Sequence, residues 1–396
     1  MKFLKFSSRG NMKYLLLLFV WHYIRKIEGI IINKVLHFGD SLTFTILMFF
    51  GEFLGGLFIL IIHKLFYSRK NASNIKLKLI DGKLKKAKMY GIDSLPRIIL
   101  LIFFAAFFDF TEFIILYYIP TIAIISPTSD QRLSITISIT SSLLSTYALR
   151  LKTGRHNSFS LIGMSTCSFI TFIFELIYKI EGNNLVNFIL AFILVFCRLM
   201  FVSFIDIIEK YLCEYNSVDK FMVLSSEGFI GIILCIIYSL TYNKNPINEI
   251  NNAYKYLDSG KSFWFIFLLF LYMVLSALTN IYKIICNYVY TPTAKSLPAY
   301  FLNPFLIIYY FIEENDFTSG GKQNYFYLII NIILAIIIDF FALIYNEFFI
   351  LYCCGLEYET YYGISERAEI NSLTHMEELN IMPNSELQLI DDDYYL

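Results

Sequence analysis

Nine long apolar runs, separated by short polar segments, divide this sequence of 396 residues. A helix needs about 20 apolar residues to cross a hydrocarbon core of about 30 Å, and each run is close to that length. Only 16% of the residues are charged, whereas a typical soluble domain has about 25%. A soluble enzyme is therefore excluded. The nine windows are 42–65, 96–118, 126–148, 158–178, 186–208, 221–241, 263–285, 296–312 and 325–350.

Residues 12–33 form a tenth and weaker window, which Arg25, Lys26 and Glu28 interrupt. Its front part resembles a signal peptide, but no small-residue cleavage site follows it. We therefore predict a first, tilted helix here. The expected fold is an all-α polytopic membrane protein with ten transmembrane helices.

Basic residues are divided unevenly between the two sides of this arrangement. With a cytosolic N-terminus, twenty-one Lys and Arg residues lie in cytosolic segments and eight lie on the opposite side. Most of the residues between 64 and 97 that contribute to this excess belong to the basic loop 67–94. Because cytosolic loops are enriched in Lys and Arg, we predict that both termini are cytosolic.

Cysteine labelling tests this topology. Ile80→Cys, in the basic loop, and Gly320→Cys, after the ninth window, should label from opposite sides of the membrane in a background without other cysteines. An odd number of predicted spans separates the two positions. The sequon that begins at Asn71 lies in the same cytosolic loop and should stay unglycosylated. Labelling of both positions from one side, or glycosylation of Asn71, would contradict the ten-span arrangement.

The second and seventh spans resemble each other. MFFGEFLGGLFILII (48–62) and LSSEGFIGIILCIIY (224–238) each contain a glutamate, a Phe-containing step, a later glycine and an unbroken apolar run. Glu52 and Glu227 are equivalent in this comparison. Since the two spans are five apart, the two helices run in opposite directions through the bilayer.

Two further matches occur in the same order along the chain. The Thr-Glu pair at 111–112 corresponds to the Thr-Asn pair at 279–280, and the Pro-Thr pair at 127–128 corresponds to that at 292–293. We infer two inverted repeats of five helices. Such a duplication is typical of secondary transporters, which hold the substrate near the midplane and rock one half against the other.

The composition changes after Gly355. The last 41 residues carry many acids, end in DDDYYL and contain too few apolar residues to form a core. We predict a disordered cytosolic tail here. The expected division of the chain is 1–178 for the first repeat, 179–355 for the second and 356–396 for the acidic tail.

Four segments also carry a family resemblance: MFFGEF (48–53), AAFFDFTEFIILYYI (105–119), PTSDQRLSITISITSSLLS (127–145) and IIEKYLCEYNSVDKFMVLSSEGFIGIIL (207–234). They resemble the drug/metabolite transporter superfamily, in particular the F-type branch of the nucleotide-sugar-transporter-like solute carrier 35 family. The resemblance implies a ten-helix fold with cytosolic termini in a Golgi or endolysosomal membrane. It also implies a central cavity lined by spans one to four and six to nine.

The chain departs from this branch in two places. Ile208 precedes Glu209 and Lys210, where the branch has a second acid before the lysine. The ninth span reads AKSLPAYFLNPF and lacks the Gly-Ala-Leu-Asn-Lys type of signature found in carriers of GDP-sugars. The expected substrate is therefore a nucleotide sugar, a nucleotide or another small metabolite.

Ionisable side chains within the spans are the candidate substrate-binding residues, because each costs about 2.5–3.5 kcal/mol at the bilayer centre. The acids suit an organic cation or a coupled proton, and the basic residues suit a nucleotide or another anion. Each also has a structural alternative, namely a bond to a neighbouring helix or a salt bridge within the group. The candidates are Glu52, Asp109, Glu112, Arg132, Arg198, Glu227 and Lys283.

These features favour a secondary-active carrier of a small organic solute. The alternative is a non-transporting scaffold or receptor subunit that keeps the carrier fold. The sequence has no P-loop, HExxH or CxxC motif, so we expect no ATP-driven pumping, enzyme activity, cofactor or metal. Acidic and basic residues balance, which gives no reason to expect nucleic-acid binding. The expected partners are the lipid bilayer, the substrate and a second copy of the chain, bound through spans five and ten.

Overall fold

The computed structural model of the chain is almost entirely helical. It describes residues 4–6, 13–36, 41–62, 95–122, 133, 135–150, 154–179, 185–216, 218–242, 259–289, 292–296, 300–301, 303–313, 318–319, 322–323, 325–352, 354–360 and 363. The longer helices are α1 (Lys13–Leu36), α2 (Ser41–Ile62), α4 (Leu95–Ile122), α6 (Ile135–Ala148), α7 (Arg155–Lys179), α8 (Leu185–Lys210), α9 (Lys220–Thr241), α11 (Ser259–Val289), α13 (Asn303–Glu313) and α14 (Tyr325–Tyr345). The shorter elements are β1 (Leu4–Phe6), a π-helical turn (Tyr211–Tyr215), α12 (Pro292–Ser296), β2 (Thr318–Ser319), β3 (Lys322–Gln323), β4 (Phe349–Leu351) and a 3-10 turn (Leu356–Glu359).

Seven of these helices are long and apolar enough to cross a membrane. They contain the spans 42–62, 95–116, 155–174, 189–215, 220–241, 263–289 and 325–345. The chain is thus an all-α, multi-pass integral membrane protein, as the sequence predicted. Helices also occupy the three remaining windows, but α1 is interrupted by charged residues, α6 has 14 residues and α13 has 11.

The ninth window differs from the single helix expected at 296–312. It contains the end of α12 and, after a 3-10 turn at 300–301, all of α13. Pro292 is the first residue of α12 and Pro304 is the second residue of α13. Proline is tolerated in the first helical turn, where its missing N–H has no intrahelical partner, but it disrupts a helix interior. The prolines therefore divide this window into two short helices.

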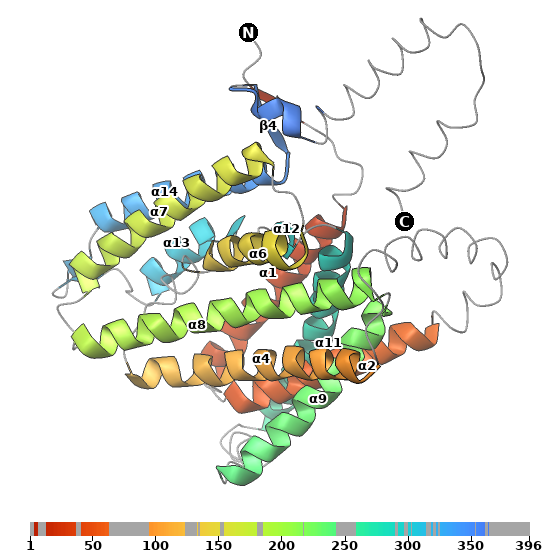
Figure 1. The fold of residues 1–396 in the computed structure, drawn as a ribbon. Coiled ribbons are helices and arrows are strands. Elements are labelled where there is room, and N and C mark those ends of the chain that lie inside the picture. The colour runs from red at the N-terminus through yellow and green to blue at the C-terminus, as the bar shows by residue number, and fades with distance from the viewer. Residues whose placement is uncertain are drawn as a thin grey trace, which may run out of the picture.

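Helices that are far apart in the sequence lie side by side in the fold (Figure 1). α2 packs against α9, α4 packs against α8 and α9, and α11 packs against α1 and α2. α6 contacts α8 as well, so that α8 lies between α4 and α6 in Figure 1. α7 packs against α14, and α14 also contacts α13.

Glycines allow α2 to approach two partner helices at backbone distance. A Cβ atom at Gly51 would lie 2.5 Å from the carbonyl oxygen of Met273 on α11. A Cβ atom at Gly228 on α9 would lie 2.5 Å from the backbone nitrogen of Phe53. Both distances are too short for any other residue. Gly51 and Gly55 also have the GxxxG spacing that is common where transmembrane helices meet.

The two ends of the described chain meet at one side of the helical bundle. β1 pairs antiparallel with β4, so that Lys5 lies opposite Ile350. Figure 1 shows the N-terminus next to β4, beyond the ends of α7 and α14. An even number of membrane crossings requires this placement of the two ends on one side.

Candidate functional site

Glu52 lies where α2 contacts α11, and its side chain is 5% exposed. Nδ2 of Asn280 on α11 donates a hydrogen bond to Oε1 of Glu52. The approach of Gly55 to Ala277, one turn before Asn280, brings the two side chains together. A buried carboxylate needs such a donor, because its removal from water is otherwise very costly.

Glu227 lies on α9 beside the crossing of α9 and α2, and its side chain is also buried. A Cβ atom on the next residue, Gly228, would lie 2.9 Å from Cβ of Glu52. The two glutamates interact electrostatically, and Oε1 of Glu227 has no hydrogen-bond partner among the described residues. The structure therefore brings to one helix crossing the two glutamates that the sequence comparison made equivalent.

Asp109 and Glu112 lie one turn apart on α4 and extend this group towards α8 and α11. Oε1 of Glu112 lies 3.8 Å from Nε of Arg198 on α8. Asp109 interacts electrostatically with Glu52 and with Lys283 of α11. Four helices thus contribute to the group besides α9.

Acids outnumber basic residues in this group, which we call the central group. Its members are Glu52, Asp109, Glu112, Arg198, Glu227, Asn280 and Lys283. Arg198 is engaged with Glu112, while Glu227 and Asp109 have no ion pair of their own among the described residues. The described chain also holds no cluster of three or more His, Cys, Asp or Glu residues that would suit a metal ion. The central group can therefore attract an organic cation or take up protons.

A second buried network joins α8, α11 and α12, and we call it the α12 network. Nζ of Lys295 on α12 donates to Oδ1 of Asp206 and lies 3.8 Å from Oε2 of Glu209. Nδ2 of Asn287 on α11 donates to the carbonyl oxygen of Asp206 at 2.7 Å and to Oε2 of Glu209 at 2.8 Å. Asp206 and Asn287 are each 1% exposed. The network is thus enclosed by protein and links three helices.

Two further lysines hold the C-terminal end of α11. Nζ of Lys210 donates to the carbonyl oxygens of Asn287 at 3.0 Å and Tyr288 at 3.3 Å. Nζ of Lys220, in the first turn of α9, lies 4.7 Å from the centre of the Tyr288 ring. The last carbonyl groups of a helix lack intrahelical partners and carry a partial negative charge, which these cations stabilise. The end of α11 is therefore tied to both α8 and α9.

Lys295 lies outside the seven candidate spans. Burial alone lowers its pKa, but the carboxylates of Asp206 and Glu209 outweigh this effect and raise the pKa above its usual range. Lys295 therefore stays protonated at physiological pH. Opening of the α12 network requires the charged groups to separate rather than the lysine to lose its proton.

The α12 network was missed in the sequence. Glu209 and Lys210 were noted there, but the absence of an acid at Ile208 drew attention away from a paired-acid role. Asp206 supplies the second acid one turn earlier, because residues three apart lie on the same helical face. A search for acids at this spacing would have found Asp206. Nothing in the sequence singles out Lys295, which is 89 residues away.

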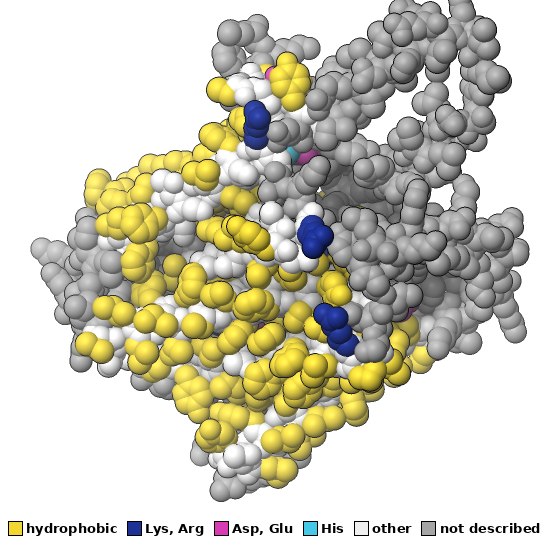
Figure 2. Space-filling view, in the orientation of Figure 1, with side chains coloured by type: hydrophobic (Ala, Val, Ile, Leu, Met, Phe, Trp, Pro, Cys, Tyr) yellow, Lys and Arg dark blue, Asp and Glu magenta, His cyan; other side chains and the backbone are white. Residues whose placement is uncertain are grey.

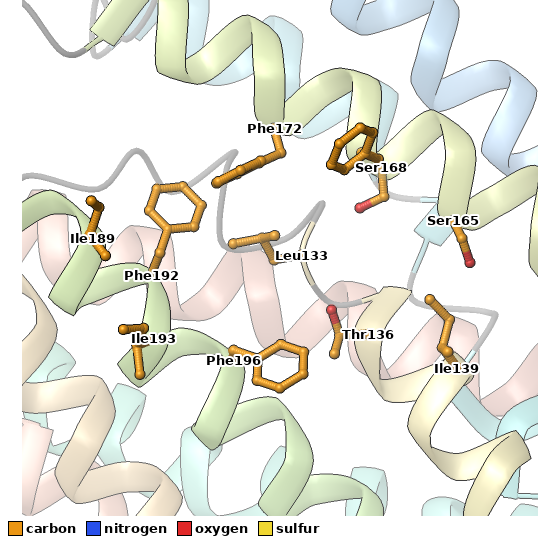
Figure 3. Close-up of a pocket in the computed structure, with 11 residues that line it drawn as sticks. Leu133, Thr136, Ile139, Ser165, Ser168, Phe172, Ile189, Phe192, Ile193 and Phe196 are labelled. Atoms are coloured by element: carbon orange, nitrogen blue, oxygen red, sulfur yellow. The ribbon is translucent and has the colours of Figure 1, made fainter.

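An apolar pocket of about 470 Å³ opens between α6, α7 and α8. Figure 3 shows the rings of Phe172, Phe192 and Phe196 around it. Its described lining includes no charged side chain, and no member of the central group lines it. Its polar groups are the hydroxyls of Thr136, Ser165 and Ser168. This pocket is therefore separate from the candidate site.

The family resemblance rests on short segments that the structure describes only in part. Three of them contribute to the contacts above, through Glu52, Asp109 with Glu112, and the α8–α9 region. Arg132 and the beginning of the segment at 127–145 lie outside the described residues. No family model matches the chain, and no curated protein is detectably similar to it in sequence.

Proposed function

We propose that the chain is a secondary-active carrier of a small organic solute, built from two inverted five-helix repeats. The observation that carries the proposal is a contact between equivalent positions. Aligning Glu52 with Glu227 makes Phe53 equivalent to Gly228, and these two residues meet where α2 crosses α9. Halves related by a two-fold pseudo-axis have such self-equivalent contacts only on the axis. A substrate site near this axis is what alternating access between inverted repeats requires.

The pattern of helix contacts supports the same relation. In this proposal α1, α2, α4, α6 and α7 correspond to α8, α9, α11, α12 with α13, and α14. The α4–α8 contact then corresponds to α11–α1, α4–α9 to α11–α2, α2–α4 to α9–α11 and α6–α7 to α13–α14. The contacts α2–α9, α7–α14 and α6–α12 are their own counterparts. A two-fold pseudo-axis between the repeats predicts these pairs.

The two buried groups have different roles in this mechanism. The central group lies at the crossing of the halves and provides charges that a substrate or a proton would contact. The α12 network holds the ends of α8, α11 and α12 together on the side that we predict to be cytosolic. Rocking of the halves to open that side would separate Lys295 from Asp206. The α12 network therefore acts as the cytosolic gate in this proposal.

The charge balance of the central group narrows the substrate class. A nucleotide sugar, a nucleotide or another metabolite was expected from the sequence. Four acids against two basic residues favour a metabolite that carries a positive charge, or one that exchanges together with protons. A dianionic nucleotide would need a further cation, and Arg132 is the candidate for that role.

We further propose cytosolic termini, a Golgi or endolysosomal membrane and a homodimer through α7 and α14. The pairing of β1 with β4 supports an even number of crossings, since it places both ends on one side. The two helices also expose apolar side chains such as Ile162 (67% exposed) and Ile336 (56% exposed). A second copy of the chain or lipid would cover these side chains.

Uptake into proteoliposomes tests the proposed function. We expect the purified chain to accumulate one class from a panel of nucleotide sugars, nucleotides, amino acids and organic cations. Lys283→Gln should lower the rate at least about tenfold, equivalent to about 1.4 kcal/mol, because it removes a charge from the central group. Lys26→Gln, at an exposed lysine of α1, is the matched control and should transport at the unmodified rate.

Two outcomes would contradict the carrier proposal. One is that no class accumulates above protein-free liposomes. The other is that Lys283→Gln remains folded, as judged by size-exclusion chromatography, and transports as fast as the unmodified chain. Either result would favour the scaffold or receptor subunit, which can lose central charges and still assemble.

A further inference from the structure

A pocket of about 570 Å³ lies between the end of α6, the start of α4 and the end of α8. α4 contributes Arg97, and the chain at the end of α6 contributes Leu149 and Arg150. Ile208 and Tyr211 line the pocket from α8 and the π-helical turn that follows it. Since α8 lies between α4 and α6 (Figure 1), it forms the floor, and the other two helices form the walls.

The pocket combines two guanidinium groups with apolar walls. Arg97 and Arg150 are both exposed, and the described residues that line the pocket include no acid. Figure 2 shows that the basic side chains on this face lie along one edge, near the beginnings of α4 and α7 and the end of α6. The rest of the described surface in this view is mainly apolar.

The pocket lies at the level where helices leave the membrane. Arg97 is in the first turn of α4, and Arg150 follows the last turn of α6. α4 and α6 expose apolar side chains further along, including Leu100 (51% exposed) and Leu143 (54% exposed). In the predicted topology this end is cytosolic, where the membrane leaflet carries anionic lipids.

Buried neighbours fix the position of Arg150. Oη of Tyr215 donates a hydrogen bond to the carbonyl oxygen of Leu149 at 2.7 Å, and the Leu149 side chain packs against Ile207 and Tyr215. The φ angle of Arg150 is 53°, in the left-handed region that residues other than glycine disfavour. Such conformations persist where the surrounding structure imposes them, often at functional sites. The arginine is therefore presented to the pocket by a rigid turn.

We propose that this pocket binds the phosphate group of an anionic glycerophospholipid. The guanidinium groups of Arg97 and Arg150 would each donate to phosphate oxygens, a geometry that guanidinium suits better than ammonium does. The acyl chains would lie along the apolar surfaces of α4 and α6. A lipid with a choline headgroup is disfavoured, because the described lining offers no acid to its cation.

Titration of the delipidated full chain in detergent, followed by native mass spectrometry, tests this site without measuring transport. Phosphatidic acid should bind more tightly than phosphatidylcholine. Arg97→Gln and Arg150→Gln should each weaken phosphatidic acid binding about fivefold, and the double variant about 25-fold, as expected for basic residues near anionic lipid. Arg155→Gln is the matched control, because Arg155 is an exposed arginine in the first turn of α7 that does not line the pocket.

The remaining arms separate the alternative results. Arg150→Lys keeps the charge but not the guanidinium, and it provides a second variant if Arg150→Gln does not fold. Equal binding by the double variant and the unmodified chain would overturn the proposal. So would inorganic phosphate that displaces phosphatidic acid and binds equally well alone, since the site would then recognise a free anion. Loss of lipid binding in the double variant with unchanged substrate uptake would leave both proposals standing.

Discussion

Lys295→Met should lower the free energy of unfolding by about 3–5 kcal/mol, the range found when one partner of a buried ion pair is removed. The reason is that Asp206 is 1% exposed and accepts a hydrogen bond from Lys295. Its other oxygen, Oδ2, has no hydrogen-bond partner among the described residues. Thermal unfolding with a thiol-reactive dye measures the change, because Cys213 and Cys286 are buried in the folded chain and react once it unfolds.

Two further variants separate the buried charge from a general effect of losing a lysine. Asp206→Asn combined with Lys295→Met should recover a large part of the stability, because no uncompensated charge remains. Lys220→Met removes only a cation–π contact with Tyr288 and should cost about 0.5–1 kcal/mol. A Lys295→Met variant as stable as the unmodified chain, or a double variant no better than the single one, would show that the pair does not hold α12 in place.

The membrane helices were predictable because the signal is local. Each apolar window records within itself that it is long and apolar enough to span, and a helix occupies every window wholly or in part. The division of the ninth window depends on where Pro304 falls relative to a helix start, which hydropathy does not register. The pairing of β1 with β4 joins residues more than 340 positions apart, and only the packing of the whole chain determines it.

The central group was predictable in part for a different reason. Burial of charge within a span is costly, so that Glu52, Glu227 and Lys283 stand out in any apolar run. The partners of these residues do not stand out. Asn280 is a neutral side chain, and its bond to Glu52 joins residues 228 positions apart. The glycines that set the helix spacing determine which polar groups meet, and this spacing is a property of three-dimensional packing.

Glu227→Gln should slow substrate-driven exchange at least about tenfold, or about 1.4 kcal/mol on the rate-limiting barrier. This prediction depends on the proposed carrier function. Oε1 of Glu227 has no hydrogen-bond partner among the described residues, and the residue lies beside the crossing at Gly228, where the halves must move. Glutamine has the same shape but no charge and cannot gain or lose a proton. Counterflow in proteoliposomes, with the substrate identified by the uptake panel, measures the rate.

Glu52→Gln should have a similar effect while keeping the local structure, because a glutamine oxygen can still accept the hydrogen bond from Asn280. Combining it with Lys283→Gln should restore part of the rate if the interaction between Glu52 and Lys283 sets the access equilibrium. Asp219→Asn is the matched control, since Asp219 is an exposed acid whose side chain caps α9 and asparagine caps helices equally well. Unmodified exchange in both glutamine variants would show that the glutamates are not a gating pair. Failure of both to fold, with a folded control, would assign them to holding α2, α9 and α11 together.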